Sequence, residues 1–129
     1  MRGILLIAHG SRARETESVL ESIAQMVKDR MDGVIAEEFA ESFTIECAFM
    51  EFSDKTVERG VSSLARQNVS EIIVVPYFLF MGIHMKEDIP KIVSECAAIH
   101  PNIRITMCEP FEVDGRLADI IADRIKACV

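Results

Sequence analysis

Gly3-Ile-Leu-Leu-Ile-Ala-His9-Gly-Ser11 is the stretch that decides the fold of this 129-residue chain. A short apolar run without polar interruption is typical of a strand buried on both faces of a parallel sheet, and Gly10-Ser11 ends it. Apolar residues then recur at three- and four-residue spacing over residues 14–31, with Gly33 beyond them. This pattern predicts an amphipathic helix that ends near Gly33. The apolar positions are Val19, Leu20, Ile23, Met26, Val27 and Met31.

The same alternation of strand and helix occurs three more times along the chain. Strands are predicted near residues 43–50, 71–76 and 103–108, and apolar stripes of helical spacing follow at 57–65, 89–96 and 117–125. Because helices that join parallel strands make right-handed crossovers, the pattern predicts an α/β fold. We expect an open four-stranded parallel sheet with helices on both faces and the strand order 2-1-3-4.

Two local boundaries are less determined by the pattern. Residues 34–42 are compatible with an extension of the first helix, a short extra helix or a loop, and the sequence favours none of these. The step Asp88-Ile89-Pro90 is predicted to begin the third helix, because proline fits the first turn and an acidic residue fits the positive end of the helix dipole.

Composition narrows the class of protein. Half of the residues are apolar, 27% are charged, and no Pro/Gly/Ser-rich linker divides the chain, so we expect a single domain over residues 1–129. A net charge of −7 without a basic run argues against a nucleic-acid partner. The apolar runs are too short for a signal peptide or a membrane span, which predicts a cytoplasmic protein.

The four cysteines are scattered and never form a C-x-x-C pair. In a cytosolic chain this spacing favours free thiols that serve as small core residues over a disulfide or a zinc site. The residues concerned are Cys47, Cys96, Cys108 and Cys128.

Candidate functional residues follow the predicted strand ends. Ligands of open parallel sheets bind beyond the carboxyl ends of the strands, where His9, Glu51, His84 and Glu109 would meet. Neutral imidazoles bind Fe²⁺, Co²⁺, Ni²⁺ and Zn²⁺, and a carboxylate would complete a His₂Glu set with open positions. His100, which precedes Pro101 at a helix end, is expected to be structural.

Each of the two carboxylates also has a simpler structural interpretation. In this alternative, Glu51 caps the following helix or faces water, with Ser53 or Asp54 also available as the N-cap of that helix. A solvated loop position is the simpler interpretation of Glu109.

The segment Tyr77–Met85 is strongly apolar where a polar loop would be usual. Met81 and Met85 flank Gly82 and His84, and such a surface suits the flat face of a macrocycle or a partner chain. Packing of Phe78, Phe80 and Met81 into the protein's own core is the alternative.

The sequence contains two informative motifs, Leu6-Ile-Ala-His-Gly-Ser-Arg12 and Pro76-Tyr-Phe-Leu-Phe-Met-Gly-Ile-His-Met-Lys-Glu-Asp-Ile-Pro90. Together they resemble the CbiX family of sirohydrochlorin chelatases. Ala48-Phe-Met-Glu51 is also similar to an Ala-Phe-Leu-Glu segment of longer family members, with Met50 in place of the leucine. The resemblance spans essentially the whole chain and implies a chelatase-like half-domain.

The resemblance implies an enzyme, a lyase-class metal chelatase that inserts a divalent metal ion into sirohydrochlorin during cobalamin, sirohaem or nickel tetrapyrrole synthesis. Co²⁺ is the first expectation, with Fe²⁺ or Ni²⁺ as alternatives, and the metal is a substrate rather than a tightly bound cofactor. His9 and His84 match the family's metal-binding histidines, and Glu51 matches an active-site glutamate. The residues expected to bind the tetrapyrrole are Ser11, Arg12, Met81, Gly82 and Met85.

The resemblance also implies a mechanism and a partner. The ring is distorted and loses two pyrrole protons as the metal enters, while a neutral imidazole, whose ordinary pKa is ~6.5, holds the metal or accepts a proton. Sirohydrochlorin carries many carboxylates, so Arg12, Arg14 and Lys86 are candidate counter-charges in this acidic chain. Longer relatives contain two such domains in one chain, which implies a homodimer here that covers the apolar segment.

Two other functions use a similar histidine. A histidine phosphatase also has a His-Gly pair after its first strand, but it needs an arginine before the histidine, where this chain has Ala8. A non-enzymatic tetrapyrrole or metal carrier would use the same two histidines as ligands and would differ from a chelatase in turnover alone.

Overall fold

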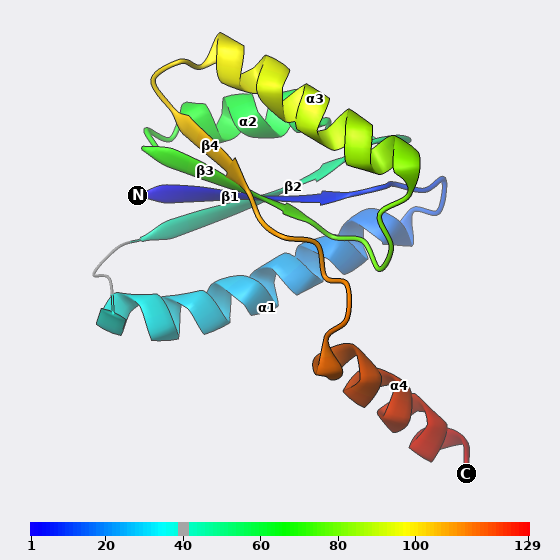
Figure 1. Ribbon diagram of the computed structural model, residues 1–129. Coiled ribbons are helices and arrows are strands. Elements are labelled where there is room, and N and C mark those ends of the chain that lie inside the picture. Colours follow the sequence, from blue (N-terminus) through cyan, green and yellow to red (C-terminus); the bar gives the residue numbers. More distant parts are fainter. Residues whose placement is uncertain (39–41) are drawn as a thin grey trace.

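A computed structural model describes residues 1–38 and 42–129 of the chain. Its centre is a parallel sheet of β1 (Arg2–Ala8), β2 (Phe43–Phe49), β3 (Glu71–Pro76) and β4 (Arg104–Met107). The strands lie in the order β2-β1-β3-β4, so the predicted α/β class and strand order are confirmed (Figure 1). Because every pair is parallel, all four carboxyl ends lie at one edge of the sheet.

β1 is central because it is apolar on both faces. It pairs with β2 on one side and with β3 on the other. Leu5 and Ile7 are completely buried on one face, and Ile4 and Leu6 are buried on the other. Apolar side chains on alternate faces can bury surface only if helices cover both sides of the sheet.

Three helices cover the sheet. α1 (Glu15–Glu38) packs on one face, and α2 (Val57–Ala65) and α3 (Ile83–Ile99) lie on the other (Figure 1). α1 continues past Gly33, so the predicted end near that residue is wrong. One glycine in open space costs a helix about 1 kcal/mol and breaks no hydrogen bond, which is not enough to end a long helix.

The third helix begins earlier than predicted. α3 starts at Ile83, with Gly82 as its N-cap, and the Lys86 N–H donates to the Gly82 carbonyl at 3.0 Å. The segment Asp88-Ile89-Pro90, predicted to begin the helix, therefore lies within it. Pro90 is exposed, so the carbonyl that lacks its usual N–H partner can be solvated, and the helix tolerates the proline.

Two further local predictions need correction. Thr56, rather than Ser53 or Asp54, is the N-cap of α2, and its side chain accepts from the Arg59 N–H. Ser53 instead donates to a carboxylate of α1, Glu17, at 2.5 Å. All four cysteines are free, as expected, but Cys108 and Cys128 are exposed and are not core residues.

α4 (Gly115–Cys128) covers neither face of the sheet. It follows β4 after a linker and stands away from the other helices (Figure 1). None of its residues is buried, although the stripe Leu117, Ile120, Ile121 and Ile125 has the predicted helical spacing. Across the described ranges, no helix is long and apolar enough to cross a membrane.

Gly10 joins the loops that follow β1 and β2. The ladder between the two strands continues beyond them, because Met50 donates to the Ala8 carbonyl and Glu51 donates to the His9 carbonyl at 2.9 Å. Gly10 has φ +96°, and a Cβ atom there would lie 2.0 Å from the Glu51 carbonyl oxygen. Only glycine allows this turn and this close approach.

Replacing Gly10 with alanine should therefore lower the free energy of unfolding by about 1–3 kcal/mol, because the left-handed turn is strained and the two loops must separate. Urea unfolding followed by circular dichroism measures this effect. The matched control is Gly33→Ala, a helical position with open space around it, which should raise the free energy of unfolding by about 0.5–1 kcal/mol. Equal stability of the two variants would show that the turn at Gly10 is unstrained.

Candidate functional site

His9 and Glu51 form the centre of the candidate site. The Nε2 atom of His9 lies 3.4 Å from an Oε2 atom of Glu51, and both side chains are 52% exposed. The pair is held by the backbone bond between the two residues beyond the ends of β1 and β2. An exposed imidazole next to a carboxylate at the carboxyl edge of a parallel sheet is a candidate site for metal or proton transfer.

His84 occupies the first turn of α3 and is exposed. Figure 1 shows the start of α3 at the same end of the sheet as the loop that follows β1. In the part of the chain that the structure describes, however, no three His, Cys, Asp or Glu side chains lie close enough to hold one metal ion. The structure brings His9 and Glu51 together and does not bring the predicted third member to them.

The polar residues predicted to bind the tetrapyrrole have local contacts of their own. The Ser11 hydroxyl accepts the Ala13 N–H at 3.0 Å and so shapes the turn before α1. The Arg12 guanidinium lies 5.1 Å from the centre of the Phe52 ring. Phe52 is exposed and has φ +58°, a conformation that no sequence pattern predicts for phenylalanine, so this contact was missed.

The apolar segment 77–85 divides between core and surface. Phe78, Met81 and Met85 are half-buried and pack against the core under α2 and α3, which leaves the two methionines only partly available to a ligand. The large exposed side chains of this segment are instead Leu79, Phe80 and Ile83, at 63%, 89% and 77% exposure. The sequence signal for this surface was the run of apolar residues in a loop, but it could not distinguish inward from outward side chains.

A hollow of about 330 Å³ lies next to the His9–Glu51 pair, between the loop after β2 and α3. Glu51 and Met85 line it together with acidic residues of α3, so the hollow connects two of the predicted site residues. Its lining is Met50, Glu51, Met85, Asp88, Lys91, Ile92 and Glu95.

The remaining candidates lie outside this pair. Arg14, Lys86 and Glu109 are exposed, and the first two are free to turn toward an anionic ligand. His100 is half-buried at the C-cap of α3, where its backbone N–H donates to the Cys96 carbonyl at 3.1 Å, in agreement with a structural role.

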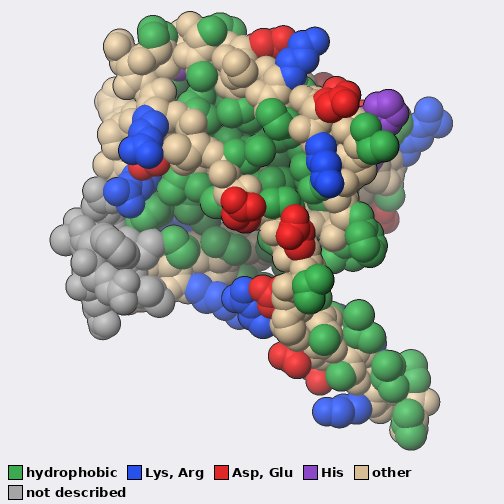
Figure 2. Space-filling view, in the orientation of Figure 1, with side chains coloured by type: hydrophobic (Ala, Val, Ile, Leu, Met, Phe, Trp, Pro, Cys, Tyr) green, Lys and Arg blue, Asp and Glu red, His purple; other side chains and the backbone are tan. Residues whose placement is uncertain are grey.

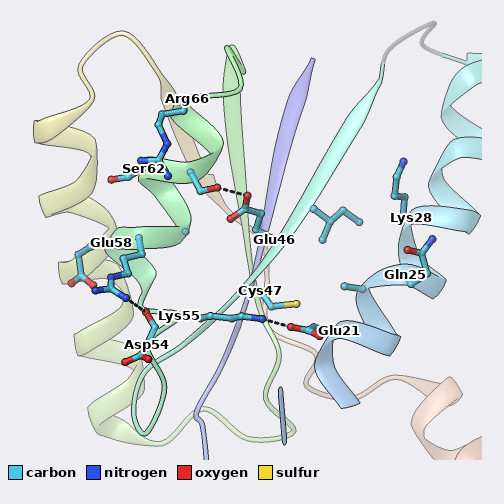
Figure 3. Close-up of a pocket in the computed structure, with 15 residues that line it drawn as sticks. Glu21, Gln25, Lys28, Glu46, Cys47, Asp54, Lys55, Glu58, Ser62 and Arg66 are labelled. Atoms are coloured by element: carbon cyan, nitrogen blue, oxygen red, sulfur yellow. Dashed lines mark hydrogen bonds and ion pairs between the residues drawn. The ribbon is translucent and has the colours of Figure 1, made fainter. Parts of the chain in front are cut away.

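A larger cavity of about 890 Å³ lies away from the candidate site, between α1 and α2 along the open edge of β2 (Figure 3). None of the predicted site residues lines it. Lys55 reaches across this edge to Glu21 of α1, and Ser63 of α2 bonds to Glu46. Burial raises the pKa of the Cys47 thiol there to about 11, so this thiol is protonated near neutral pH and is no nucleophile.

Comparison with known proteins points to one family. The CbiX family model matches residues 3–128. A sirohydrochlorin cobaltochelatase of Methanopyrus kandleri is 32% identical over 146 residues, which cover 98% of this chain and 96% of the relative. The chloroplastic sirohydrochlorin ferrochelatase of Arabidopsis thaliana is 30% identical over 127 residues, which cover 98% of this chain and 52% of the relative.

Comparison with solved structures leads to the same family. The sirohydrochlorin chelatase SirB of Bacillus subtilis subspecies spizizenii, solved in complex with cobalt, superposes with a TM-score of 0.80 at 25% identity, over 98% of this chain and 50% of SirB. The match therefore extends over nearly all of this chain in both sequence and structure. The chain belongs to the CbiX family.

Proposed function

We propose that this chain is a metal chelatase that inserts a divalent metal ion into sirohydrochlorin. The observation that carries the proposal is the His9–Glu51 pair, 3.4 Å apart and open to solvent at the carboxyl edge of a CbiX-family sheet. Co²⁺ is the first candidate metal, because the Methanopyrus relative of similar length is a cobaltochelatase. Fe²⁺ and Ni²⁺ are the alternatives, and the Arabidopsis relative is a ferrochelatase.

His9 and Glu51 would share two tasks. An imidazole nitrogen and a carboxylate oxygen are both good ligands for these metals, and together they leave most coordination positions open for the incoming ring nitrogens. The same two groups accept protons, so either can remove a pyrrole proton as the metal enters. The short distance between them allows a proton to pass from one to the other.

His84 is proposed as the second imidazole. A metal that is a substrate must be released to the ring, so the free chain does not need a closed three-ligand site. The position of His84 at the exposed start of α3 allows it to approach the metal or the ring when sirohydrochlorin is bound. This arrangement would favour transfer over tight storage of the metal.

The ring would lie against exposed apolar side chains beside this pair. Leu79, Phe80 and Ile83 offer the apolar surface, and Gly82 and the exposed parts of Met81 and Met85 adjoin them along the chain. Ser11 is proposed to contact the ring from the loop that follows β1, two residues after His9. Arg12, Arg14 and Lys86 would bind substrate carboxylates, which offsets the repulsion from a chain of net charge −7.

We infer that the reaction takes place in a cytoplasmic homodimer. Residues 1–129 would act as one CbiX-type domain that pairs with a second copy, because SirB is about twice as long and the apolar surface of segment 77–85 needs cover. Four free thiols, with no disulfide, are typical of a cytoplasmic protein.

His9→Ala and His84→Ala should each lower kcat/KM for metal insertion at least roughly 100-fold, because each variant lacks a proposed metal ligand or proton acceptor. Anaerobic assays with sirohydrochlorin and Co²⁺, Fe²⁺ or Ni²⁺, followed by absorbance, measure this. His100→Ala is the matched control and should keep wild-type turnover. Wild-type protein that binds metal and ring but gives only one turnover would identify a carrier instead of an enzyme.

Glu51→Gln removes the charge of Glu51 and keeps its shape. Insertion should slow by about 10-fold or more, and by different factors for the three metals, because the metals differ in their preference for a carboxylate ligand. Glu109→Gln, at an exposed position beyond β4, is the control. Unchanged insertion rates with every metal would show that Glu51 takes no part in the reaction and is a solvated or capping residue.

Insertion should slow as the pH is lowered from 8 to 5. Protons compete with the metal for the imidazole nitrogen, and a protonated imidazole can no longer accept a pyrrole proton, so the loss affects binding and chemistry together. Rates corrected for the uncatalysed reaction, with circular dichroism to verify folding at each pH, measure this. A level rate over this range would rule out both roles for the histidines.

A further inference from the structure

Phe52 is an unusual residue at the edge of the candidate site. It directly follows Glu51, its side chain is 56% exposed, and its backbone has φ +58°. A bulky residue adopts this left-handed conformation only where the surrounding structure holds it there. Phe52 also belongs to no core cluster of the described residues, so its ring does not serve to bury apolar surface in the core. The ring therefore has another role.

The loop that carries Phe52 is fastened by bonds in which the ring takes no part. The Phe49 N–H donates to the Lys55 carbonyl at 2.8 Å and closes the loop. Ser53 ties the loop to α1 through its 2.5 Å bond to Glu17. Because neither bond involves an atom of Phe52, replacing the ring leaves the loop anchored. The effect of such a replacement then reports on what the ring contacts.

The ring contacts the side chain of Arg12. The guanidinium carbon lies over the face of the ring, 5.1 Å from its centre. This distance is within the ~6 Å over which the electron-rich face of an aromatic ring attracts a cation. Arg12 comes three residues after His9, and Phe52 directly follows Glu51. The contact therefore joins the same two loops as the His9–Glu51 pair, and it adds a held cation to them.

The contact leaves the polar edge of Arg12 free. The five N–H donors of a guanidinium lie in its plane, so a ring under one face blocks none of them. Within residues 1–38 and 42–129, these donors make no hydrogen bond or ion pair. A carboxylate fits this edge with two parallel charge-assisted hydrogen bonds. An arginine that is already held also loses less side-chain entropy on binding than one that moves freely.

Individual cations matter in this chain because its positive charges are dispersed. The net charge is −7, and Figure 2 shows Lys and Arg side chains in separate small groups among acidic and hydrophobic ones on the face that it presents. A ring that carries many carboxylates then depends on single positioned cations more than on the field of a basic patch. Of the three cations proposed to bind it, Arg12, Arg14 and Lys86, the first is the one that rests on an aromatic ring in the described part of the chain.

We propose that Phe52 is a positioning residue, whose ring holds the Arg12 guanidinium so that it binds a carboxylate of sirohydrochlorin beside the His9–Glu51 pair. This inference rests on the proposed function and adds a residue to it. Phe52 itself takes no part in metal binding or proton transfer, so its contribution is to the binding of the ring.

Titration of metal-free sirohydrochlorin, followed by absorbance, tests the proposal without turnover. Phe52→Leu replaces the aromatic face with an aliphatic side chain and should raise the dissociation constant about 3-fold, the size expected of an exposed contact between a cation and an aromatic ring. Both residues carry a Cβ atom, so the left-handed backbone is equally strained in the two proteins. Phe52→Tyr keeps the aromatic face and should keep the wild-type constant.

A double-mutant cycle shows whether the ring acts through Arg12. Arg12→Gln should raise the dissociation constant about 10-fold, because it removes the charge-assisted bonds to the carboxylate. Adding Phe52→Leu to Arg12→Gln should have no further effect. Arg30→Gln is the matched control, because it removes an exposed arginine of α1 whose side chain bonds to the Met26 carbonyl. In this background Phe52→Leu should keep its full effect.

The kinetics of insertion separate positioning of Arg12 from an indirect effect on Glu51. If the ring acts through Arg12, Phe52→Leu raises KM for sirohydrochlorin and leaves kcat within about 2-fold of wild type. Three results would each overturn the proposal: a larger fall in kcat, a binding loss that persists in the Arg12→Gln background, or equal dissociation constants for wild type and Phe52→Leu.

Failure of this inference and failure of the proposed function give different results. Wild-type protein that binds no sirohydrochlorin overturns both. Wild-type protein that binds the ring without repeated turnover is a carrier, and the dissociation constants still decide the role of Phe52. Repeated turnover by a wild-type protein whose double-mutant cycle shows no coupling overturns the role of Phe52 and leaves the chelatase intact.

Discussion

Parallel pairing of β1 with both β2 and β3 is the constraint on which the rest of the structure depends. It requires apolar residues on both faces of β1, so helices must lie on both sides of the sheet. It also aligns the strand ends, so the residue after β1 and the residue two places after β2 become neighbours. His9 and Glu51 meet because their strands pair in register, and not because either side chain attracts the other strongly.

Sequence reasoning identified this arrangement because its signals are local. An apolar run ending in His-Gly-Ser indicates a buried strand and its end, and four such units with helices between them limit the topology to very few possibilities. Features that depend on distant contacts were not predictable. The start of α3 at Ile83, the exposure of Phe80 and the orientation of Phe52 are set by packing and backbone conformation.

The sequence predicted that α4 is a helix but not where it packs. Its apolar residues recur at helical spacing, which is a local property of the sequence and predicted the helix correctly. The stripe contains no information about which surface covers it. His84 is similar, because the sequence showed that it follows the third strand, whereas its distance from the His9–Glu51 pair depends on where α3 begins.

Charged side chains protect the open edge of β2 from pairing with another strand. β2 is an edge strand, and the unpaired backbone groups of an edge strand invite another strand to add to the sheet and begin a fibre. Lys55 crosses this edge to Glu21, and the Glu46 carboxylate beside it is held by Ser63, so an incoming strand would have to desolvate several charges. Loss of these charges would leave the unpaired backbone groups of β2 open to strand addition, although the candidate site at the carboxyl edge would be unchanged.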